Sequence, residues 1–147
     1  MNIDEMSLKI IKHLRDGRKS FQEIARSLSV TTNTIRARVT KLMKQGVLEI
    51  IGAVDAEKIE NHFLVIVGVR LKSMRLVDKG EEFSRLKGVI SVAVVTGRFD
   101  LILTVLLNNK FGLHEFYTQE VSRIRDVMST ETFVVYKNYN WKVPYNL

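Results

Sequence analysis

Hydrophobic residues in the first third of the chain recur at helical spacing, in three short stretches separated by turn signals. The first stretch follows Asp4, a good helix N-cap, and the second follows a capping box formed by Ser20 and Glu23. The third lies between Thr31, another N-cap, and Gly46, which suits the end of a helix. We therefore predict three short helices around one small core. Their apolar positions are Leu8, Ile10, Ile11 and Leu14, then Phe21, Ile24, Ala25 and Leu28, then Ile35, Val39 and Leu42.

The corner between the second and third predicted helices has the pattern of a helix-turn-helix. Ala25 is small where the two helices cross, Ser29 lies in the turn, and Ile35 anchors the second helix in the core. Glycine is frequent at the position of Ser29, so a side chain there has to tolerate an unusual φ. The pattern predicts a helix-turn-helix over residues 20–39.

The outer face of the second helix of this motif is polar. At about 100° per residue, the face opposite Ile35 and its two flanks carry residues suited to DNA. Asn33 suits adenine and Arg36 suits guanine in the major groove, so both are candidates for reading base edges. Three others suit phosphate better: Thr32, Lys41 and Lys44.

Arg38 lies closer to the core side of the same helix. Two interpretations stay open for it: contact with double-stranded DNA, or an ion pair with an acid such as Asp4 or Glu23. The full set of predicted DNA contacts is Thr32, Asn33, Thr34, Arg36, Ala37, Arg38, Lys41 and Lys44.

The charge of the chain is concentrated at this motif. Residues 17–48 hold seven basic residues and one acid, Glu23, which gives 7 − 1 = +6, while the whole chain carries +7. A dense positive region over a helix-turn-helix is the expected footprint of phosphate contact. A solvated basic face explains the charge alone equally well. The basic residues are Arg18, Lys19, Arg26, Arg36, Arg38, Lys41 and Lys44.

The rest of the chain alternates strand and helix patterns. Residues 47–54 are β-rich and predict either a wing strand or the exit from the helical region, and residues 55–62 form a polar connector. The later elements follow the order β-α-β-β-α-β, typical of a ferredoxin-like fold. We expect strands at 63–71, 89–96, 101–107 and 130–139, helices at 77–86 and 111–124, and a hairpin turn at 97–100.

The predicted fold class is α+β, with a winged helix-turn-helix domain over residues 1–60 and a ferredoxin-like domain over residues 61–147. The helix apolar sets are Val77, Phe83 and Leu86, then Phe111, Phe116, Val121 and Ile124. Two helices on one face of a four-stranded sheet leave the other face bare. Because apolar residues run continuously through the second and third of these strands, we expect that face to bury against a second copy. The aromatic tail, residues 138–147, is expected to pack on a neighbour.

Composition excludes several classes of protein and site. No apolar run reaches the ~18 residues of a membrane span, and the first residues show no secretory signal. The chain has no cysteine, which rules out disulfides and thiolate metal sites and is compatible with the cytoplasm. His13, His62 and His114 are scattered, and no phosphate loop or nucleophile motif is present. We predict no catalytic residue, no metal site, no cofactor and no enzyme activity.

A helix-turn-helix joined to a βαββαβ domain in this arrangement resembles the Lrp/AsnC (feast/famine) family of bacterial and archaeal transcription regulators, whose second domain is RAM- or ACT-like. Ser29 replaces the usual glycine, Thr31–Thr32 replaces a common Ser-Pro, and no glycine follows Ile59. These departures affect corner and connector shape. The matching stretches are 3–14, 16–20, 24–25, 34–42, 46–55, 96–100 (TGRFD) and 130–132 (TET).

The resemblance implies a homodimer formed by the second domains, often assembled into an octamer. It also implies an amino acid or related small effector held near the hairpin. An amino acid needs an acceptor for its ammonium, such as Asp100, and donors for its carboxylate, such as the backbone around Gly97. A plain tight turn explains Gly97 and Asp100 as well. The implied effector residues are Gly97, Arg98, Phe99, Asp100, Thr130 and Thr132.

Two other functions remain open. A protein of this build can compact DNA generally, through phosphates alone. Some proteins that resemble the family decarboxylate sirohaem and carry histidines near the hairpin, but residues 96–103 here (TGRFDLIL) contain none. We therefore expect a DNA-binding regulator modulated by an amino acid.

Overall fold

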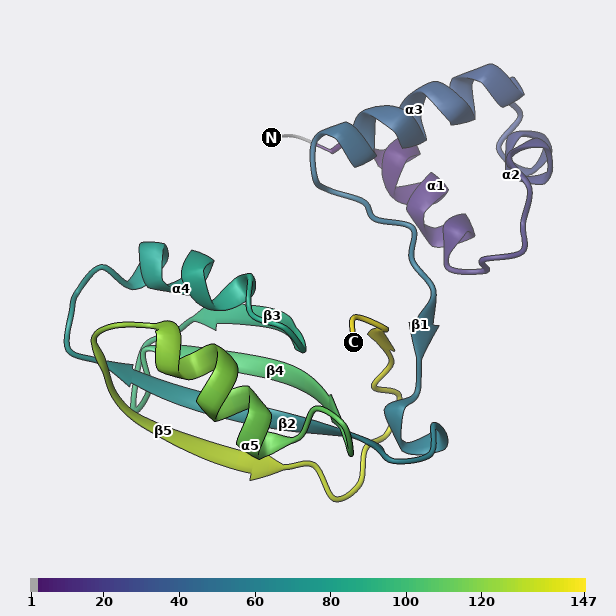
Figure 1. The fold of residues 1–147 in the computed structure, drawn as a ribbon. Coiled ribbons are helices and arrows are strands. Elements are labelled where there is room, and N and C mark those ends of the chain that lie inside the picture. The colour runs from purple at the N-terminus through teal and green to yellow at the C-terminus, as the bar shows by residue number, and fades with distance from the viewer. Residues whose placement is uncertain (1–2) are drawn as a thin grey trace. The chain divides into compact units, whose positions relative to one another are not determined.

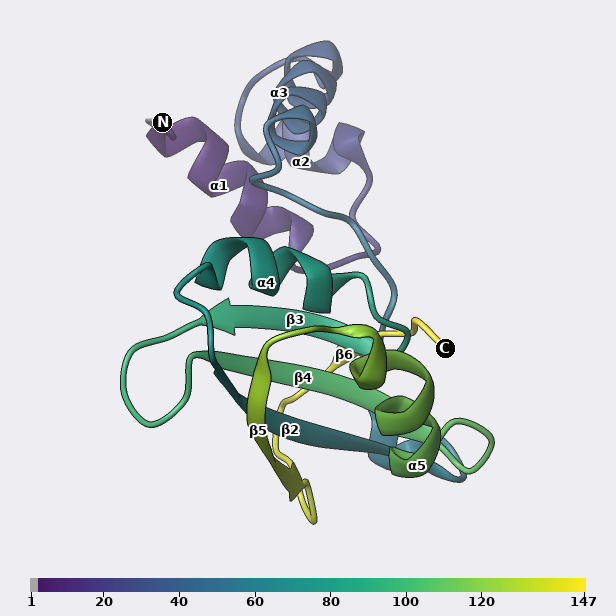
Figure 2. The same cartoon turned by 60° about the vertical axis from the view of Figure 1, so that its left-hand side comes forward.

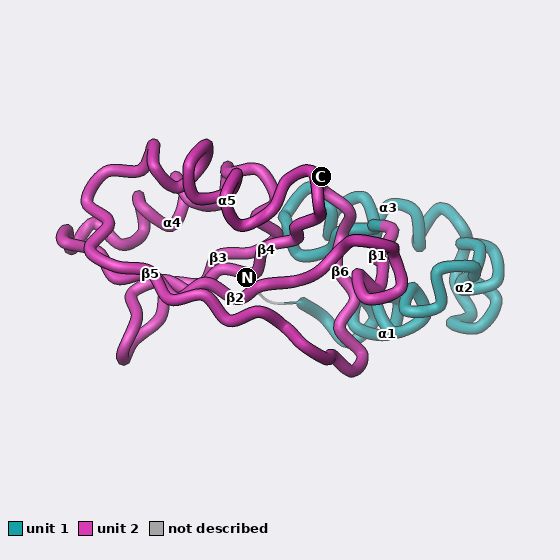
Figure 3. Tube along the Cα trace, turned by 60° about the horizontal axis from the view of Figure 1, so that its bottom comes forward, with its two compact units in different colours: residues 1–51 teal, residues 52–147 magenta. Residues whose placement is uncertain are grey.

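The computed structural model describes residues 3–147. The chain forms two compact units, residues 1–51 (unit 1) and 52–147 (unit 2), coloured separately in Figure 3. The domain boundary expected after residue 60 falls inside unit 2. The segment before that boundary belongs to unit 2 because Ala53 and Val54, at its start, pair with the C-terminal tail.

Unit 1 consists of three helices, α1 (Glu5–Leu14), α2 (Phe21–Ser27) and α3 (Thr32–Lys44) (Figure 1). Each begins at the predicted N-cap, whose side chain accepts a backbone N–H in the first turn. The Ser20–Glu23 capping box is complete in both directions. Because each cap satisfies donors that the helix leaves free, the three starts are fixed locally. The buried core comprises Ile10, Ile24, Ala25, Ile35 and Val39.

The turn of the helix-turn-helix has the predicted strain. Ser29 adopts φ 54°, and the Val30 N–H donates to the Ala25 carbonyl oxygen at 3.0 Å. This bond across a left-handed residue ends α2 and turns the chain toward α3.

One position on α1 differs from the prediction. Leu8 is exposed, whereas Ile10 is completely buried, with Met6 and Leu14 packed beside it. Residues 6, 10 and 14 recur every four positions and share one face, while Leu8 lies about 200° around the helix from Ile10.

The segment after α3 is an exit and not a wing. Its only strand, β1 (Ala53–Val54), pairs with β6 (Val143–Pro144) in unit 2. Ile50 and Ile51 are exposed. The described part of unit 1 contains no strand, which corrects the winged description of the helix-turn-helix.

Unit 2 contains a four-stranded antiparallel sheet in the order β3-β4-β2-β5. Its strands are β2 (His62–Leu71), β3 (Val89–Val94), β4 (Leu101–Asn108) and β5 (Val127–Val134). The helices α4 (Leu76–Ser84) and α5 (Leu113–Glu115) cover one face, as Figure 2 shows. The helical segment of α5 continues through a π turn (Phe116–Glu120) and a 3-10 turn (Val121–Arg123). This arrangement confirms the ferredoxin-like βαββαβ prediction.

The helix-covered core is built from alternate strand residues. Val65, Val67 and Val69 of β2 are fully buried there, together with Phe83 and Phe116 from the helices. Val77, predicted to face the sheet, is exposed. Gly80 takes the inward position on α4, where an added Cβ would lie 3.3 Å from the Val94 side chain.

Strand β5 begins and ends earlier than the predicted 130–139. Its pairing with β2 runs from Leu71↔Val127 to Val65↔Val134, and one more bond joins the Val135 N–H to the Leu64 carbonyl. Beyond this point only the first two residues of β2 remain, so the chain leaves the sheet and Lys137 pairs with Glu57. Composition alone did not reveal this limit, because Val135, Tyr136 and Tyr139 are residues that suit a strand.

The C-terminal tail folds onto its own unit, and packing of its exposed tyrosines, Tyr136 and Tyr139, on a neighbour stays a prediction. Val143 is buried against Ala56, Leu64 and Leu106. Leu64 and Leu106 belong to the sheet face without helices, so the tail covers one end of that face.

No helix in the described residues is long and apolar enough to cross a membrane.

Candidate DNA interface and effector site

The outer face of α3 presents the side chains predicted to read DNA. Asn33, Arg36, Ala37, Lys41 and Lys44 are all exposed. The Arg36 Nη1 donates to the Asn33 Oδ1 at 2.9 Å, so the two candidate base-reading groups hold each other. Neither Lys41 nor Lys44 has an acidic partner among residues 3–147. Positive charge on this face is therefore available to phosphates.

Thr32 and Thr34, in the first turn of α3, have different roles. The Thr34 backbone N–H donates to the Thr31 hydroxyl at 3.2 Å, and the two hydroxyls lie 2.9 Å apart. The Thr34 hydroxyl therefore supports the cap. Thr32 is half-buried at the helix N-terminus, where the helix dipole favours anions.

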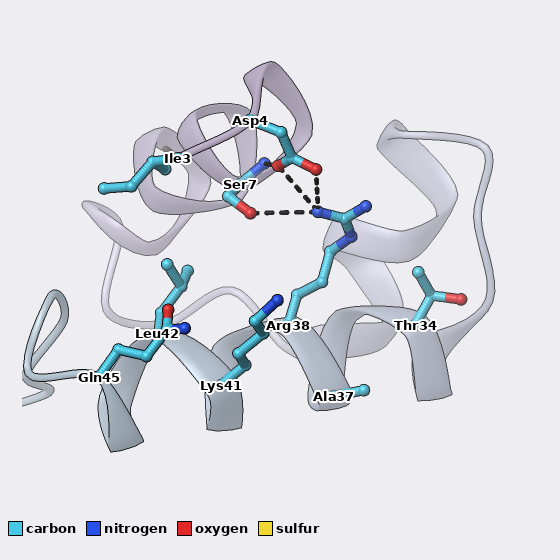
Figure 4. Close-up of a pocket in the computed structure, with 9 residues that line it drawn as sticks. All are labelled: Ile3, Asp4, Ser7, Thr34, Ala37, Arg38, Lys41, Leu42 and Gln45. Atoms are coloured by element: carbon cyan, nitrogen blue, oxygen red, sulfur yellow. Dashed lines mark hydrogen bonds and ion pairs between the residues drawn. The ribbon is translucent and has the colours of Figure 1, made fainter. Parts of the chain in front are cut away.

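Arg38 is held inside unit 1 (Figure 4). Its Nη1 lies 2.6 and 2.8 Å from the two carboxylate oxygens of Asp4 and 3.1 Å from the Ser7 Oγ. The Asp4 Oδ1 also accepts the Ser7 N–H at 2.8 Å as the cap of α1. Hydrogen bonds from Arg38 and then Ser7 hold the pKa of the Asp4 carboxyl well below its ordinary value. Of the two interpretations left open for Arg38, the structure shows the ion pair.

A cavity of about 520 Å³ lies beside this ion pair, between the start of α1 and α3 (Figure 4). Thr34, Ala37 and Lys41 line it from α3, and Ile3 lines it from the α1 side. With Arg38, four predicted DNA contacts therefore border a hollow in the surface, which gives this flank of α3 a concave shape.

The predicted effector hairpin lies between β3 and β4 and is closed by the Val95 N–H donating to the Asp100 carbonyl oxygen at 3.0 Å. Gly97 has φ 122°, a conformation that favours glycine. The Asp100 N–H donates to the Val69 carbonyl at 2.9 Å, and its Oδ2 accepts the Leu71 N–H at 2.7 Å. Asp100 thus anchors the hairpin to the end of β2.

Two other hairpin side chains lie on the sheet face without helices. Phe99 covers Gly68, where an added Cβ would come within 2.7 Å of the ring, and stacks edge-on with Phe133 at 6.4 Å. Arg98 Nη2 pairs with Glu131 Oε2 at 2.9 Å. The hairpin is therefore packed against β2 and β5.

The structure does not bring all predicted effector residues together. Thr130 and Thr132 pair with Val69 and Val67, so they face the helix side of the sheet. The Thr132 hydroxyl bonds the Tyr117 hydroxyl at 2.6 Å. Gly97, Arg98, Phe99 and Asp100 gather at the hairpin, and the residues missed there are Gly68, Glu131 and Phe133. Strand alternation would have signalled the last two, since they occupy the alternate positions of β5.

The histidines remain apart in different elements. His13 belongs to α1, His62 to β2 and His114 to α5. Within the described residues, no group of three or more His, Asp or Glu side chains is placed to hold a metal ion.

Two family models match the sequence. The AsnC-type helix-turn-helix domain matches residues 3–43, and the Lrp/AsnC ligand binding domain matches residues 64–142. The second model covers more than half of the 147 residues. Together they include most of both units and leave out residues 1–2, 44–63 and 143–147.

Relatives and solved structures agree with these matches. An uncharacterized HTH-type transcriptional regulator of Pyrococcus abyssi is 31% identical over 135 residues, covering 90% of this chain and 91% of that one. The regulatory protein AsnC of Haemophilus influenzae is 27% identical over 143 residues, 93% of each chain. The structure of E. coli AsnC has a TM-score of 0.71 at 23% identity, covering 94% of this chain and 95% of that one.

A transcriptional regulator of Neisseria meningitidis, solved as its complex with L-Met, has a TM-score of 0.73 at 16% identity, covering 95% of this chain and 94% of that one. At such identities the structural likeness shows a shared fold. The two family models and the relative at 31% identity carry the assignment further. The chain belongs to the Lrp/AsnC family of helix-turn-helix transcriptional regulators, with a ligand-binding domain after its DNA-binding domain.

Proposed function

We propose that α3 binds promoter DNA in the major groove, with Asn33 and Arg36 reading base edges. Thr32, Lys41 and Lys44 contact phosphates, and Ala37 leaves room for the close approach of a base pair. One observation carries this assignment. The outer face of α3 is exposed and basic, while Arg38, the basic residue nearest the core, forms an ion pair with Asp4. Arg38 then supports the interface from behind and does not touch DNA.

The experiment compares sequence-specific with general binding. Affinity for the promoter of the protein's own gene is measured against random DNA of equal length at several salt concentrations. A specific regulator keeps a ratio of about 10³ or more at physiological salt. A ratio near one at every salt concentration would indicate a DNA-compacting protein that binds through phosphates alone.

We propose further that the hairpin end of unit 2 binds an amino acid. Asp100 uses its Oδ2 for the Leu71 N–H, which leaves its Oδ1 for an ammonium group. Backbone N–H groups near Gly97 and the guanidinium of Arg98 suit a carboxylate. The Neisseria relative in complex with L-Met supports an amino acid as ligand class.

A thermal-shift screen of the twenty amino acids tests this site. A ligand present at 100 times its Kd stabilises the protein by about 2.7 kcal/mol. The absence of any shift at millimolar concentrations would contradict the amino-acid assignment, and the DNA-binding assignment would stand unaffected.

The proposed assembly is a homodimer, built further into an octamer, that acts on DNA in the cytoplasm. The sheet face beyond the tail supports it: Ile66 and Ile102 are only half-buried there, and Phe133 is exposed. Sizing by light scattering checks the assembly. We assign no catalytic role and no cofactor, and a tetrapyrrole absorbance band in the purified protein would contradict that assignment.

A further inference from the structure

The C-terminal tail, residues 135–147, binds the connector that leads out of unit 1. Strand β6 pairs with β1 in the register Ala53↔Pro144 and Val54↔Val143 (Figure 3). Lys137 Nζ lies 2.8 Å from Glu57 Oε2, and the other oxygen of Glu57 accepts the Asn138 N–H. These bonds hold the connector just before and within the 3-10 turn at Ala56–Lys58.

The tail is also fixed to the sheet. Val143 is 2% exposed and packs with Ala56, Leu64 and Leu106, while Trp141 and Leu147 lie beside this cluster. Near the end of the chain, the Asn146 Nδ2 donates to the Val89 carbonyl at 2.8 Å. We call these contacts, made by residues 137–147 to residues 53–57 and to the sheet, the clasp.

The clasp decides how much chain separates the two units. Unit 1 holds the chain through Leu48, whose N–H donates to the Leu42 carbonyl and whose side chain joins the helical core. Residues 49–52 are exposed, and pairing with the tail begins at Ala53. With the clasp closed, the tether between the units is therefore residues 49–52; without it, the tether extends to residue 61, before β2.

The difference in reach is large. An extended chain spans at most about 3.5 Å per residue, so residues 49–52 reach roughly 14 Å and residues 49–61 would reach roughly 45 Å. In a dimer, the tether sets the effective concentration of the second helix-turn-helix at the second half-site. A short tether permits only a narrow range of half-site separations.

We propose that the clasp determines the half-site spacing that this regulator accepts, by keeping the tether short. The inference rests on the proposed DNA-binding function of a dimer. Val143 and Glu57 are its key residues, since one buries the tail and the other binds it to the connector. They act on specificity through geometry, without contacting DNA.

Val143→Asp opens the clasp, because it places a carboxylate in a buried apolar cluster. Tyr136→Asp is the matched control: it makes the same charge change in the same tail, at a side chain that is 98% exposed. Half-sites are selected from random DNA with the wild-type protein. Pairs of them are then spaced one base pair at a time across one helical turn, and the Kd of each variant is measured.

We expect the wild type and Tyr136→Asp to bind about tenfold or more weakly when the half-sites are moved half a DNA turn from the best spacing. At that spacing the effective concentration of the second helix-turn-helix at its half-site falls sharply. For Val143→Asp we expect a spread below about threefold, with unchanged affinity for a single half-site. Hydrogen exchange at residues 53–57 confirms that the clasp has opened.

A second variant guards against misfolding of the first. Val54→Cys/Val143→Cys joins the paired positions by a disulfide in a chain that has no other cysteine. Its oxidised form should keep the narrow wild-type profile. Equal profiles for the wild type, the locked form and the opened variant would overturn the clasp inference alone. Absence of DNA binding by the wild type would instead overturn the proposed function.

Discussion

The two units hold their candidate functional residues by different kinds of contact. In unit 1, Arg36 and Lys41 extend from the outer face of one helix, whose inner face forms the core. In unit 2, the hairpin is held from outside itself: Asp100 accepts the Leu71 N–H, and Phe99 packs over the backbone of β2. The DNA face is thus separable from folding, whereas the hairpin is part of the sheet that supports it.

This difference has a functional consequence. Side chains that only face solvent are free to match a DNA sequence at little cost in stability. A hairpin bonded to two strands communicates any displacement to the sheet, because packed interiors do not deform continuously. The unit with the proposed effector site is therefore the one in which site and scaffold are coupled.

The largest expected effect tests the separability of the DNA face. Arg36→Ala combined with Lys41→Ala should weaken DNA binding by about 100-fold, since it removes one base contact and one phosphate contact. The melting temperature and the oligomer size should stay unchanged. Fluorescence anisotropy measures the DNA affinity, and light scattering measures the oligomer size. Lys9→Ala/Lys12→Ala on α1 removes equal charge and is the control. Full affinity in the first variant would show that another surface binds DNA.

A smaller effect tests the coupling in unit 2. Gly68→Ala should destabilise the protein by about 2 kcal/mol, because the new Cβ collides with the Phe99 ring. In the Phe99→Ala background the same change should be nearly neutral. Urea denaturation of the four proteins gives the coupling free energy. Additive effects would mean that the hairpin is not held by this contact.

The next effect separates sensing from folding at one residue. Asp100→Asn keeps an oxygen that can accept the Leu71 N–H but removes the negative charge. We expect unchanged stability and about tenfold weaker binding of an amino acid identified by the screen, from loss of a charge-assisted hydrogen bond. Calorimetry measures the affinity. Unchanged binding would place the ammonium elsewhere.

The smallest expected effect concerns the ion pair behind the DNA face. The folded-state pKa of Asp4 is depressed, so its contribution to stability is complete above the ordinary Asp value near 4 and is lost as the pH falls further. Asp4→Asn should therefore lower the melting temperature at pH 7, and the difference from the wild type should shrink below about pH 4. Melting curves of both proteins from pH 7 to pH 2 measure this difference in melting temperature. A constant difference would exclude the carboxylate as its source.

Several features could be read from local spacing in the sequence. The capping box joins Ser20 and Glu23, three residues apart, and the corner is fixed by Ala25 and Ile35 within one short stretch. Their geometry depends on neighbours in the chain, so the three helices appear where predicted. The βαββαβ order was also predictable, since strand and helix periodicities differ clearly.

Other features depended on partners distant in the chain. Arg38 meets Asp4 across 34 residues, and the sequence left two interpretations because nothing local distinguishes them. Thr132 was grouped with the hairpin by resemblance, yet strand pairing turns it toward Tyr117. The face of the sheet to which a side chain points depends on the strand register, and the register is fixed by the partner strand.

The sequence by itself determined the three capped helices, the helix-turn-helix with its concentrated positive charge, and the order of the second domain. These follow from interactions spanning a few residues, whose energies do not depend on the rest of the fold. Only the tertiary structure decided that the segment after α3 is an exit without a wing, that β5 ends early, and that the tail binds the connector. Each of these depends on which distant backbone groups remain unpaired once the sheet has formed, and hydrogen bonding then selects the partner.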